Sequence, residues 1–177
     1  MKPELKRVPR EELDSIADEM ARKFSCKRVA HVVRSFRLIK LEGRWTEYFV
    51  MNRVDFDPAD LPERADPFLV GRPFCERSAR GDLRIHVEGA RELTRHVDEI
   101  KTYVTERAAV LFTYGRDVLP ESIVEIRGPK EPRLVAVVYR DDLGEHCVGV
   151  GRLRFSEDGR PVVDNVIDRG WYLRRGG

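Results

Sequence analysis

Two arginines near the end of the chain, Arg152 and Arg154, alternate with apolar residues in the run GVGRLRF. Successive side chains of a β-strand point to opposite faces, so these two guanidinium groups are expected on one face, about 7 Å apart. Guanidinium groups at that spacing can contact neighbouring phosphates of a nucleic acid or stack on its bases. Arg160 in the adjoining turn and Arg169 on the final strand extend this basic face. The four arginines are candidate RNA-binding residues.

Nearby acids give the same arginines a purely structural interpretation. Four acids lie close enough in sequence to neutralise them: Glu157, Asp158, Asp164 and Asp168. Exposed ion pairs of this kind are common and stabilise a fold by less than about 1 kcal/mol each. Both interpretations stay open for Arg152 and Arg154 at this point.

A tyrosine and a glycine form a second candidate contact in the phrase LFTYGRDVL. Tyr114 could stack on a base, although burial against the core is the simpler expectation. Gly115 is expected to take the left-handed conformation that ends a helix, which leaves Arg116 in an open turn. Asp117 is expected to cap a following helical turn near Pro120. Tyr114 and Arg116 therefore join the candidate RNA-binding residues.

The most one-sided run of charge lies in the first half of the chain. No acid occurs between Met20 and Leu41, whereas basic residues are frequent there. The members that form a secondary basic patch are Lys27, Arg28, Arg34 and Arg37. The run could dock on RNA, or it could be the solvated face of the elements that carry it.

Composition limits the class of protein. The 177 residues carry a formal net charge of only +2, so a nucleic-acid site must arise from local segregation of charge. Arginine accounts for 26 of the 33 basic residues and glutamine is absent, a bias typical of thermophilic proteins. No apolar run approaches the length of a membrane span, and the first residues are charged. We expect a cytoplasmic protein without a membrane partner.

Cofactor chemistry finds little support in the sequence. Three cysteines form no CxxC, and four histidines show no metal-ligand spacing, so neither a disulfide framework nor a metal site is indicated. Cys147 follows His146 only by chance. The GVG at residues 149–151 lacks the remaining signals of a dinucleotide fingerprint, and there is no phosphate-binding GxxxxGK[ST] motif. We expect no cofactor, no metal and no catalytic residues.

The elements that must position the candidate residues are expected in two halves. In the first half, apolar residues at helical spacing predict a helix over residues 9–24, and β-branched residues predict strands over 27–41 and 45–50. A loop over residues 55–67, a strand over 68–70, a strand over 83–87 and a helix over 89–97 follow. The best domain boundary falls between residues 98 and 99, giving domains 1–98 and 99–177.

In the second half, a short helix is expected over residues 106–113, after a strand in the run IKTYVTE. Ile123, Val124 and Ile126 are expected to point to the core. Three further strands are expected over residues 134–139, 147–155 and 162–167, joined by turns rich in Asp and Gly. These elements predict a compact, mostly antiparallel barrel.

The phrases LFTYGRDVL, GVGRLRF and NVIDRGWYLRR together resemble the PUA domain, named for the pseudouridine synthases and archaeosine transglycosylases that carry it. The upstream run GDLRIHVEGARELTRHV is similar to the segment that precedes this domain in archaeal relatives of Nip-seven, a 60S ribosome-subunit biogenesis factor. The resemblance implies an α+β fold, with an N-terminal antiparallel pre-PUA domain followed by a C-terminal PUA mixed β-barrel with short helices. It also places RNA contacts at Arg152, Arg154, Arg160 and Arg169.

The resemblance implies a non-catalytic RNA-binding protein of large-subunit biogenesis or rRNA processing. Its expected partner is ribosomal RNA, single-stranded or in a loop, with a preference for uridine, and ribosome-assembly or exosome proteins are expected as further candidate partners. The alternative is an RNA-modifying enzyme or accessory subunit, in which the PUA domain directs a small N-terminal domain to structured RNA. A protein adaptor is a third hypothesis, and its mark would be an exposed apolar patch on the first domain.

Overall fold

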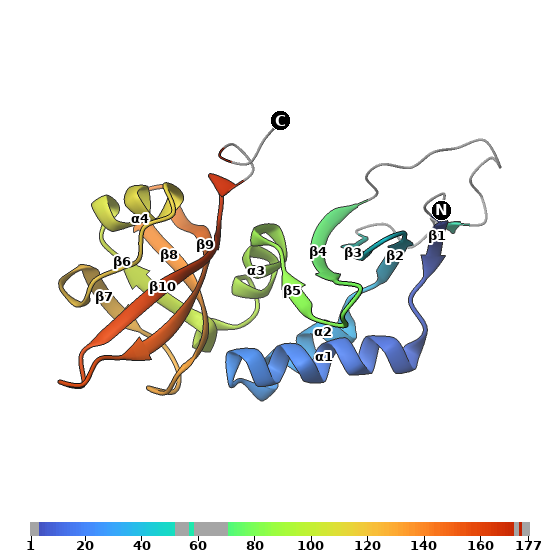
Figure 1. Cartoon of the computed structure of the whole chain (residues 1–177), viewed down its shortest axis with the longest axis horizontal. Coiled ribbons are helices and arrows are strands. Elements are labelled where there is room, and N and C mark those ends of the chain that lie inside the picture. The colour runs from blue at the N-terminus through green and yellow to red at the C-terminus, as the bar shows by residue number, and fades with distance from the viewer. Residues whose placement is uncertain (1–3, 52–56, 59–70, 172–173, 175–177) are drawn as a thin grey trace.

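The computed structural model describes residues 4–51, 57–58, 71–171 and 174. These residues form two five-stranded sheets that lie side by side along the long axis of the molecule (Figure 1). Helix α3 (Val87–Thr94) lies between them and contacts strands of both sheets. The α+β class expected from the sequence is confirmed.

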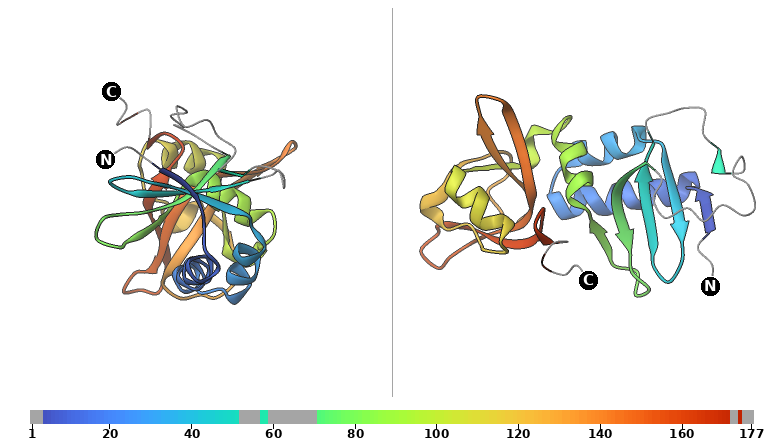
Figure 2. Two further views of the ribbon diagram at one scale, coloured as in Figure 1. Left: turned by 90° about the vertical axis from the view of Figure 1, so that its right-hand side faces the viewer. Right: turned by 90° about the horizontal axis from the view of Figure 1, so that it is seen from above.

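The first sheet is antiparallel throughout and has the order β1-β2-β3-β4-β5. Its strands are β1 (Glu4–Arg7), β2 (Leu38–Glu42), β3 (Thr46–Val50), β4 (Arg72–Arg77) and β5 (Leu83–Ile85). Helices α1 (Arg10–Phe24) and α2 (Lys27–Ser35) cover one of its faces (Figure 2). Strands β1 and β4 were not predicted from the sequence. A strand was expected at residues 68–70, after a loop; that strand and nearly all of that loop lie outside the described residues.

Helix α1 confirms the periodicity of its sequence. Its buried residues are Leu13, Ile16, Ala17, Met20 and Phe24, the positions expected to face the core. Acidic residues occupy its first turn and basic residues its last, an arrangement that favours the helix dipole. The helix ends at Ser25, whose φ of 48° is left-handed.

The strand expected over residues 27–41 is wrong for most of its length, because residues 27–35 form helix α2 and the strand begins only at Leu38. Val29, Ala30 and Val33 are buried on one face of α2, which packs against α1. The β-branched residues favour a strand only weakly, and burial of this helical face outweighs that preference.

Strand β5 ends at Ile85, and Val87, expected at the end of the strand, instead begins α3. The helix approaches β4 closely: a Cβ at Gly89 would lie 2.1 Å from the carbonyl oxygen of Phe74. Only glycine permits this approach. The packing places α3 where it can also contact β9.

The second sheet has the order β10-β9-β8-β6-β7 and is mixed, because β6 and β8 are parallel while its other pairs are antiparallel. Its strands are β6 (Lys101–Val104), β7 (Ile123–Ile126), β8 (Arg133–Asp141), β9 (Gly144–Phe155) and β10 (Pro161–Asp168). Short helices lie at η2 (Asp98–Ile100), α4 (Glu106–Thr113) and η3 (Pro120–Ser122).

The second sheet curves into a partly closed barrel. Val118 pairs with Val163 across the free edge of β10 through two backbone hydrogen bonds of 2.8 and 3.0 Å. Within the described residues no further ladder joins β10 to β7, so closure is less complete than a full barrel. Val124 on the edge strand β7 is 67% exposed and does not point to the core as expected.

Two clusters of buried apolar residues form the core. One joins α1, α2 and the first sheet to the outer face of β8 and β9, including Leu134, Ala136 and Val150. The other fills the concave side of the second sheet and includes Phe112 and Leu153. The two halves therefore share buried surface. The expected domain boundary at residues 98–99 lies between β5, the last strand of the first sheet, and β6, the first strand of the second sheet. The division into two domains at this point stays a prediction.

Candidate nucleic-acid interface

The arginines of β9 lie where the contact between the two halves ends. Val150 on the outer face of β9 is fully buried, whereas Arg152 and Arg154, the next residues on that face, are exposed. In the sheet register, Arg152 lies between Leu134 on β8 and Asp164 on β10. The two arginines share one face of the strand as the alternation predicts.

The structure distinguishes these two arginines. The Nε atom of Arg154 donates to both carboxylate oxygens of Asp164, at 2.8 and 2.7 Å, and this hydrogen bonding raises the pKa of Arg154. Arg152 has no hydrogen bond or ion pair from its side chain within the described part of the chain. Arg154 is thus partly neutralised, while Arg152 is available to a ligand.

Arg160 and Arg169 lie at opposite ends of β10, so they do not both lie beside Arg152. Arg160 lies in the turn before β10, where its Nε is 2.6 Å from Asp158. Arg169 lies just beyond the end of β10 rather than on the final strand as predicted, with its Nη2 4.0 Å from Glu88 of α3. Because β10 separates them, the two arginines lie roughly 25 Å or more apart along the chain direction.

The turn after α4 exposes an aromatic side chain. Tyr114 is 70% exposed, contrary to its expected burial, because Phe112 occupies the interior at this end of the helix. Gly115 has a φ of 84°, which confirms the expected left-handed position. Arg116 is exposed, and its side chain has no ion pair among the residues that the structure describes. Tyr114 and Arg116 are therefore both accessible.

Asp117 has a different role from the expected helix cap. Its Oδ1 accepts a hydrogen bond of 2.7 Å from the backbone N–H of Asn165, while Leu119 precedes the short helix η3. Together with the Val118–Val163 pairing, this bond holds the turn along the free edge of β10. The backbones at Arg116 and Arg152 are therefore separated by β10 alone, about 10 Å. We call the surface formed by Arg152, Arg154, Tyr114 and Arg116 the β9–turn surface.

An ion pair between the buried Asp168 and the exposed Arg174 helps to fix the position of this turn. Asp168 is completely buried, and its carboxylate accepts hydrogen bonds from Arg174 at 2.6 and 3.0 Å. Arg174 also donates to the carbonyl oxygen of Thr113 and lies against Gly115, where a Cβ would be 3.3 Å from its Nη2. Arg174 is thus part of the scaffold of the turn.

The comparisons with known proteins agree with this architecture. Residues 100–177 match the family described as the UPF0113 PUA domain. The second half of the chain is therefore similar to the UPF0113 PUA domain. An archaeal UPF0113 protein from Archaeoglobus fulgidus is 35% identical over 116 residues, which make up 62% of this chain and 63% of that relative. PUA domains generally bind RNA.

Solved structures resemble the chain over nearly its full length. A conserved PUA-domain protein from Thermoplasma acidophilum has a TM-score of 0.61 at 14% identity, with 97% of each chain covered. A hypothetical protein from the hyperthermophilic archaeon Pyrococcus horikoshii has a TM-score of 0.57 at 17% identity, with 96% of this chain and 98% of that chain covered. A PUA-domain structure from Aeropyrum pernix, a tartrate complex, has a TM-score of 0.58 at 17% identity, covering 97% and 90%. These similarities show the two-part fold.

The basic run of the first half is largely neutralised. Arg34 of α2 is 2.9 Å from Asp14 and 2.6 Å from Asp18, two acids of α1, and Arg28 is 3.6 Å from Glu99. Lys27 is exposed and has no ion pair in the described regions. Arg37 is half-buried just after α2. The four residues of the secondary basic patch therefore do not form one open cationic surface, since acids outside the run pair with it.

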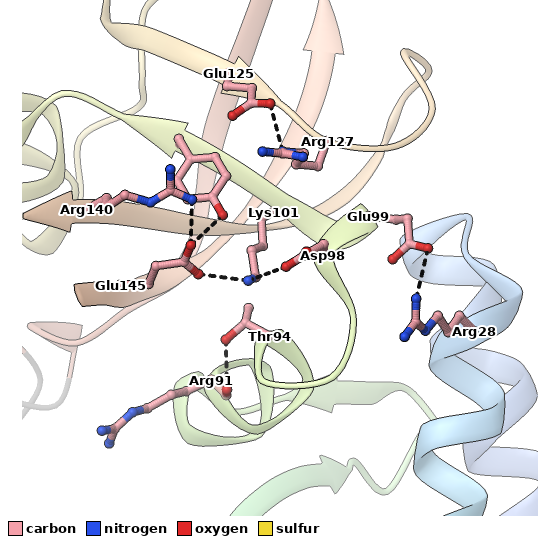
Figure 3. Close-up of polar contacts among 11 residues, drawn as sticks. Arg28, Arg91, Thr94, Asp98, Glu99, Lys101, Glu125, Arg127, Arg140 and Glu145 are labelled. Atoms are coloured by element: carbon pink, nitrogen blue, oxygen red, sulfur yellow. Dashed lines mark hydrogen bonds and ion pairs between the residues drawn. The ribbon is translucent and has the colours of Figure 1, made fainter.

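A charged cluster that the sequence did not reveal lies at the start of the second sheet (Figure 3). The buried Lys101 on β6 is 2.7 Å from Glu145 on β9, and Glu145 also accepts hydrogen bonds from Tyr103 at 2.8 Å and Arg140 at 2.6 Å. Burial alone would raise the pKa of Glu145, but the hydrogen bonds from Lys101, Arg140 and Tyr103 outweigh it and lower its pKa to about 2. Asp98 completes the cluster by binding Lys101. The cluster joins η2, β6, β8 and β9.

The adjacent Cys147 and His146 are each held in contacts other than with one another. Cys147 is buried, and burial raises the pKa of its thiol to about 11, so little thiolate exists at neutral pH. The neighbouring His146 bonds to Asp141 at 3.0 Å and stacks on Tyr139. Among the residues that the structure describes, no group of three or more His, Cys, Asp or Glu is placed to hold a metal ion, and no helix is long and apolar enough to span a membrane.

Proposed function

We propose that this chain is a non-catalytic RNA-binding protein that acts in the cytoplasm, in large-subunit ribosome biogenesis or rRNA processing. The observation that carries the proposal is the placement of Arg152. It is an exposed guanidinium without an internal partner in the described structure, on the outer face of strand β9 in the half that resembles a PUA domain. An arginine that is not engaged within its own protein is available for bidentate contact with a phosphate.

The β9–turn surface combines the two kinds of contact that single-stranded RNA requires. Arg152 and Arg116 supply charge, and Tyr114 supplies an exposed ring on which a base can stack. Asp164 and Asp117 lie between these groups, so a rigid duplex backbone would meet acids as well as arginines. A single strand or loop can place its phosphates on the arginines alone. We therefore propose single-stranded or looped RNA, with uridine-rich rRNA as the first sequence to test.

The first domain has a supporting role in this proposal. It packs against β8 and β9 through a shared core, so it holds the strand that carries Arg152. Trp45 is its one large apolar side chain that is strongly exposed in the described part, so the broad apolar patch expected of a protein adaptor is not seen there. Ribosome-assembly or exosome proteins remain partners to be tested by pull-down.

The experiment that tests the proposal is fluorescence-anisotropy binding of a U-rich oligomer across a salt series. The proposal predicts that the RNA binds at low salt. The logarithm of the binding constant should fall linearly with the logarithm of the salt concentration, with a slope of about −0.7 for each phosphate neutralised. The RNA should be recovered chemically unchanged, as judged by mass spectrometry after long incubation. No binding at low salt would reject the RNA-binding function, and base modification in the recovered RNA would favour the enzyme alternative.

A further inference from the structure

Two hairpin turns lie side by side at one end of the first sheet, away from the β9–turn surface. The β2–β3 turn comprises residues 43–45 and the β4–β5 turn comprises residues 78–82. Thr46, which follows the first turn, pairs with Arg77, which precedes the second, so the two turns are adjacent (Figure 2, right-hand view).

An exposed tryptophan lies at this end of the sheet. Trp45 is 42% exposed, although tryptophan normally buries its large ring. The guanidinium carbon of Arg84 on β5 lies 5.9 Å from the ring centroid, within the range of a cation–π contact. Two further arginines, Arg44 and Arg80, occupy the tips of the two turns and are exposed.

The arginines of the two turns form no ion pair with acids in the part of the chain that the structure describes. Within the described residues, neither Arg44 nor Arg80 has a side-chain hydrogen bond or ion pair, and Asp82 is the only acid in the two turns. Glu76 lies opposite Arg84 in the sheet register, but it is half-buried and forms no ion pair with Arg84 in this structure. By contrast, Arg77 beside them is held by Glu19 at 3.1 Å and by the carbonyl oxygen of Gly81.

A structural role explains the Trp45–Arg84 contact but not the whole group. A cation–π pair can brace two adjacent strands, and one arginine is enough for that. It does not explain two additional unpaired arginines at the tips of neighbouring turns. Exposed aromatic rings interleaved with unpaired arginines are the combination that binds single-stranded nucleic acid, because bases stack on the ring and the arginines meet the phosphates.

We propose that the turn pair is a second RNA contact, in which a base stacks on Trp45 while Arg44 and Arg80 contact the flanking phosphates. This inference rests on the proposed RNA-binding function and adds the first domain to the binding path. The first sheet and the PUA domain follow one another along the long axis (Figure 1), so a strand that reaches both must run along that axis. The affinity should therefore increase with oligomer length beyond the length that fills the PUA domain alone.

Tryptophan fluorescence tests the contact directly, because the chain has only two tryptophans. The Trp171→Phe variant leaves Trp45 as the single emitter. Titration with a U-rich oligomer of about 20 nucleotides should quench its emission with the same midpoint as the anisotropy signal, and bound RNA should shield it from acrylamide, as expected for a base stacked on the ring. If Trp171→Phe does not fold, the difference between the wild type and Trp45→Phe gives the same signal.

The outcomes separate this inference from the proposed function. RNA binding by anisotropy without any change in Trp45 emission or acrylamide access would overturn the second contact and leave the function intact. Absence of binding would reject both. The double variant Arg44→Ser/Arg80→Ser should also reduce the magnitude of the salt slope of RNA binding by about 1.4. The control is the double variant Arg91→Ser/Arg95→Ser, whose two arginines pair with acids of α3, and it should leave the slope unchanged. Equal slopes for the two double variants would contradict the proposed phosphate contacts.

Discussion

Arg154 and Asp164 form a two-bond ion pair across β9 and β10, and the neighbouring Arg152 is left without a partner among the described residues. The pair is exposed, so solvent screening leaves it little effect on stability. Its larger effect is on charge: Asp164 removes about one positive charge from a face that would otherwise present two. Asp164 therefore limits the affinity of this face for anions.

Replacing Asp164 tests that limit. Asp164→Asn releases Arg154 and removes a negative charge, so RNA should bind about three- to tenfold more tightly at low salt, with a steeper salt slope. Anisotropy titration measures both quantities. Asp158→Asn, which frees Arg160 in the turn between β9 and β10, is the matched control and should change affinity less. Equal gains in the two variants would mean that the effect is one of overall charge.

Tyr114 offers a contact that can be removed without disturbing the fold. Because its side chain is 70% exposed, Tyr114→Ser should change the free energy of unfolding by less than about 0.5 kcal/mol. Loss of base stacking should weaken RNA binding by about 1–3 kcal/mol, and Tyr114→Phe should retain most of the affinity. Urea unfolding and anisotropy together check the two effects. Unchanged affinity in Tyr114→Ser would remove the turn from the interface.

The Lys101–Glu145 pair should make the protein sensitive to acid. The folded-state pKa of Glu145 is about 2, below its usual 4.5, so its stabilising contribution is present above pH 4.5 and is lost as the pH falls from 4.5 towards 2. Thermal melts between pH 7 and pH 2.5 should show this decline. Glu145→Gln should be less stable at pH 7 and should lose less of its stability over that range. Parallel melting curves for the two proteins would contradict the assignment.

Removing Glu145 entirely should be costly at neutral pH. Glu145→Ala leaves the buried Lys101 with only Asp98 as an ionic partner, and breaking such a pair typically costs about 3 kcal/mol. Glu125→Ala is a suitable control because its ion pair with Arg127 is exposed on both sides. Chemical unfolding should show a large loss for the first variant and a loss below about 1 kcal/mol for the second.

Gly89 tests the close packing of α3 on β4. In Gly89→Ala the new Cβ would lie 2.1 Å from the Phe74 carbonyl oxygen, so the helix must move, at a cost of about 2 kcal/mol or more. Gly43→Ala is the matched control, since its Cβ would have an ordinary 3.6 Å contact. A melting temperature for Gly89→Ala equal to that of the control would show that α3 is not held against β4.

Much of the PUA-like second half could be predicted from the sequence because its signals are local. The helix over residues 106–113, the left-handed Gly115 and the strand that carries Arg152 follow from periodicity and turn chemistry. Helix α2 could not be predicted so easily, because its β-branched residues favour a strand until their packing against α1 is known.

The charge of the candidate surfaces depended on contacts that are distant in sequence. Arg34 and Asp14 are 20 residues apart, so the run without acids appeared more basic than it is. The pairing of Asp164 with Arg154 rather than with Arg152, its partner in the register, depends on side-chain conformations that the sequence does not encode locally. The exposure of Tyr114 likewise depends on Phe112 filling the core beneath it.

Comparison of two single variants tests the central claim most directly. Arg152→Ser and Arg10→Ser each remove one exposed arginine, the first from the β9–turn surface and the second from the start of α1, where Arg10 lies 3.4 Å from Asp14. RNA affinity should fall about tenfold in Arg152→Ser, with a salt slope smaller by about 0.7, and should stay near the wild-type value in Arg10→Ser. Equal affinities for Arg152→Ser and the wild type, with both proteins folded, would contradict the assignment of this surface as the RNA site.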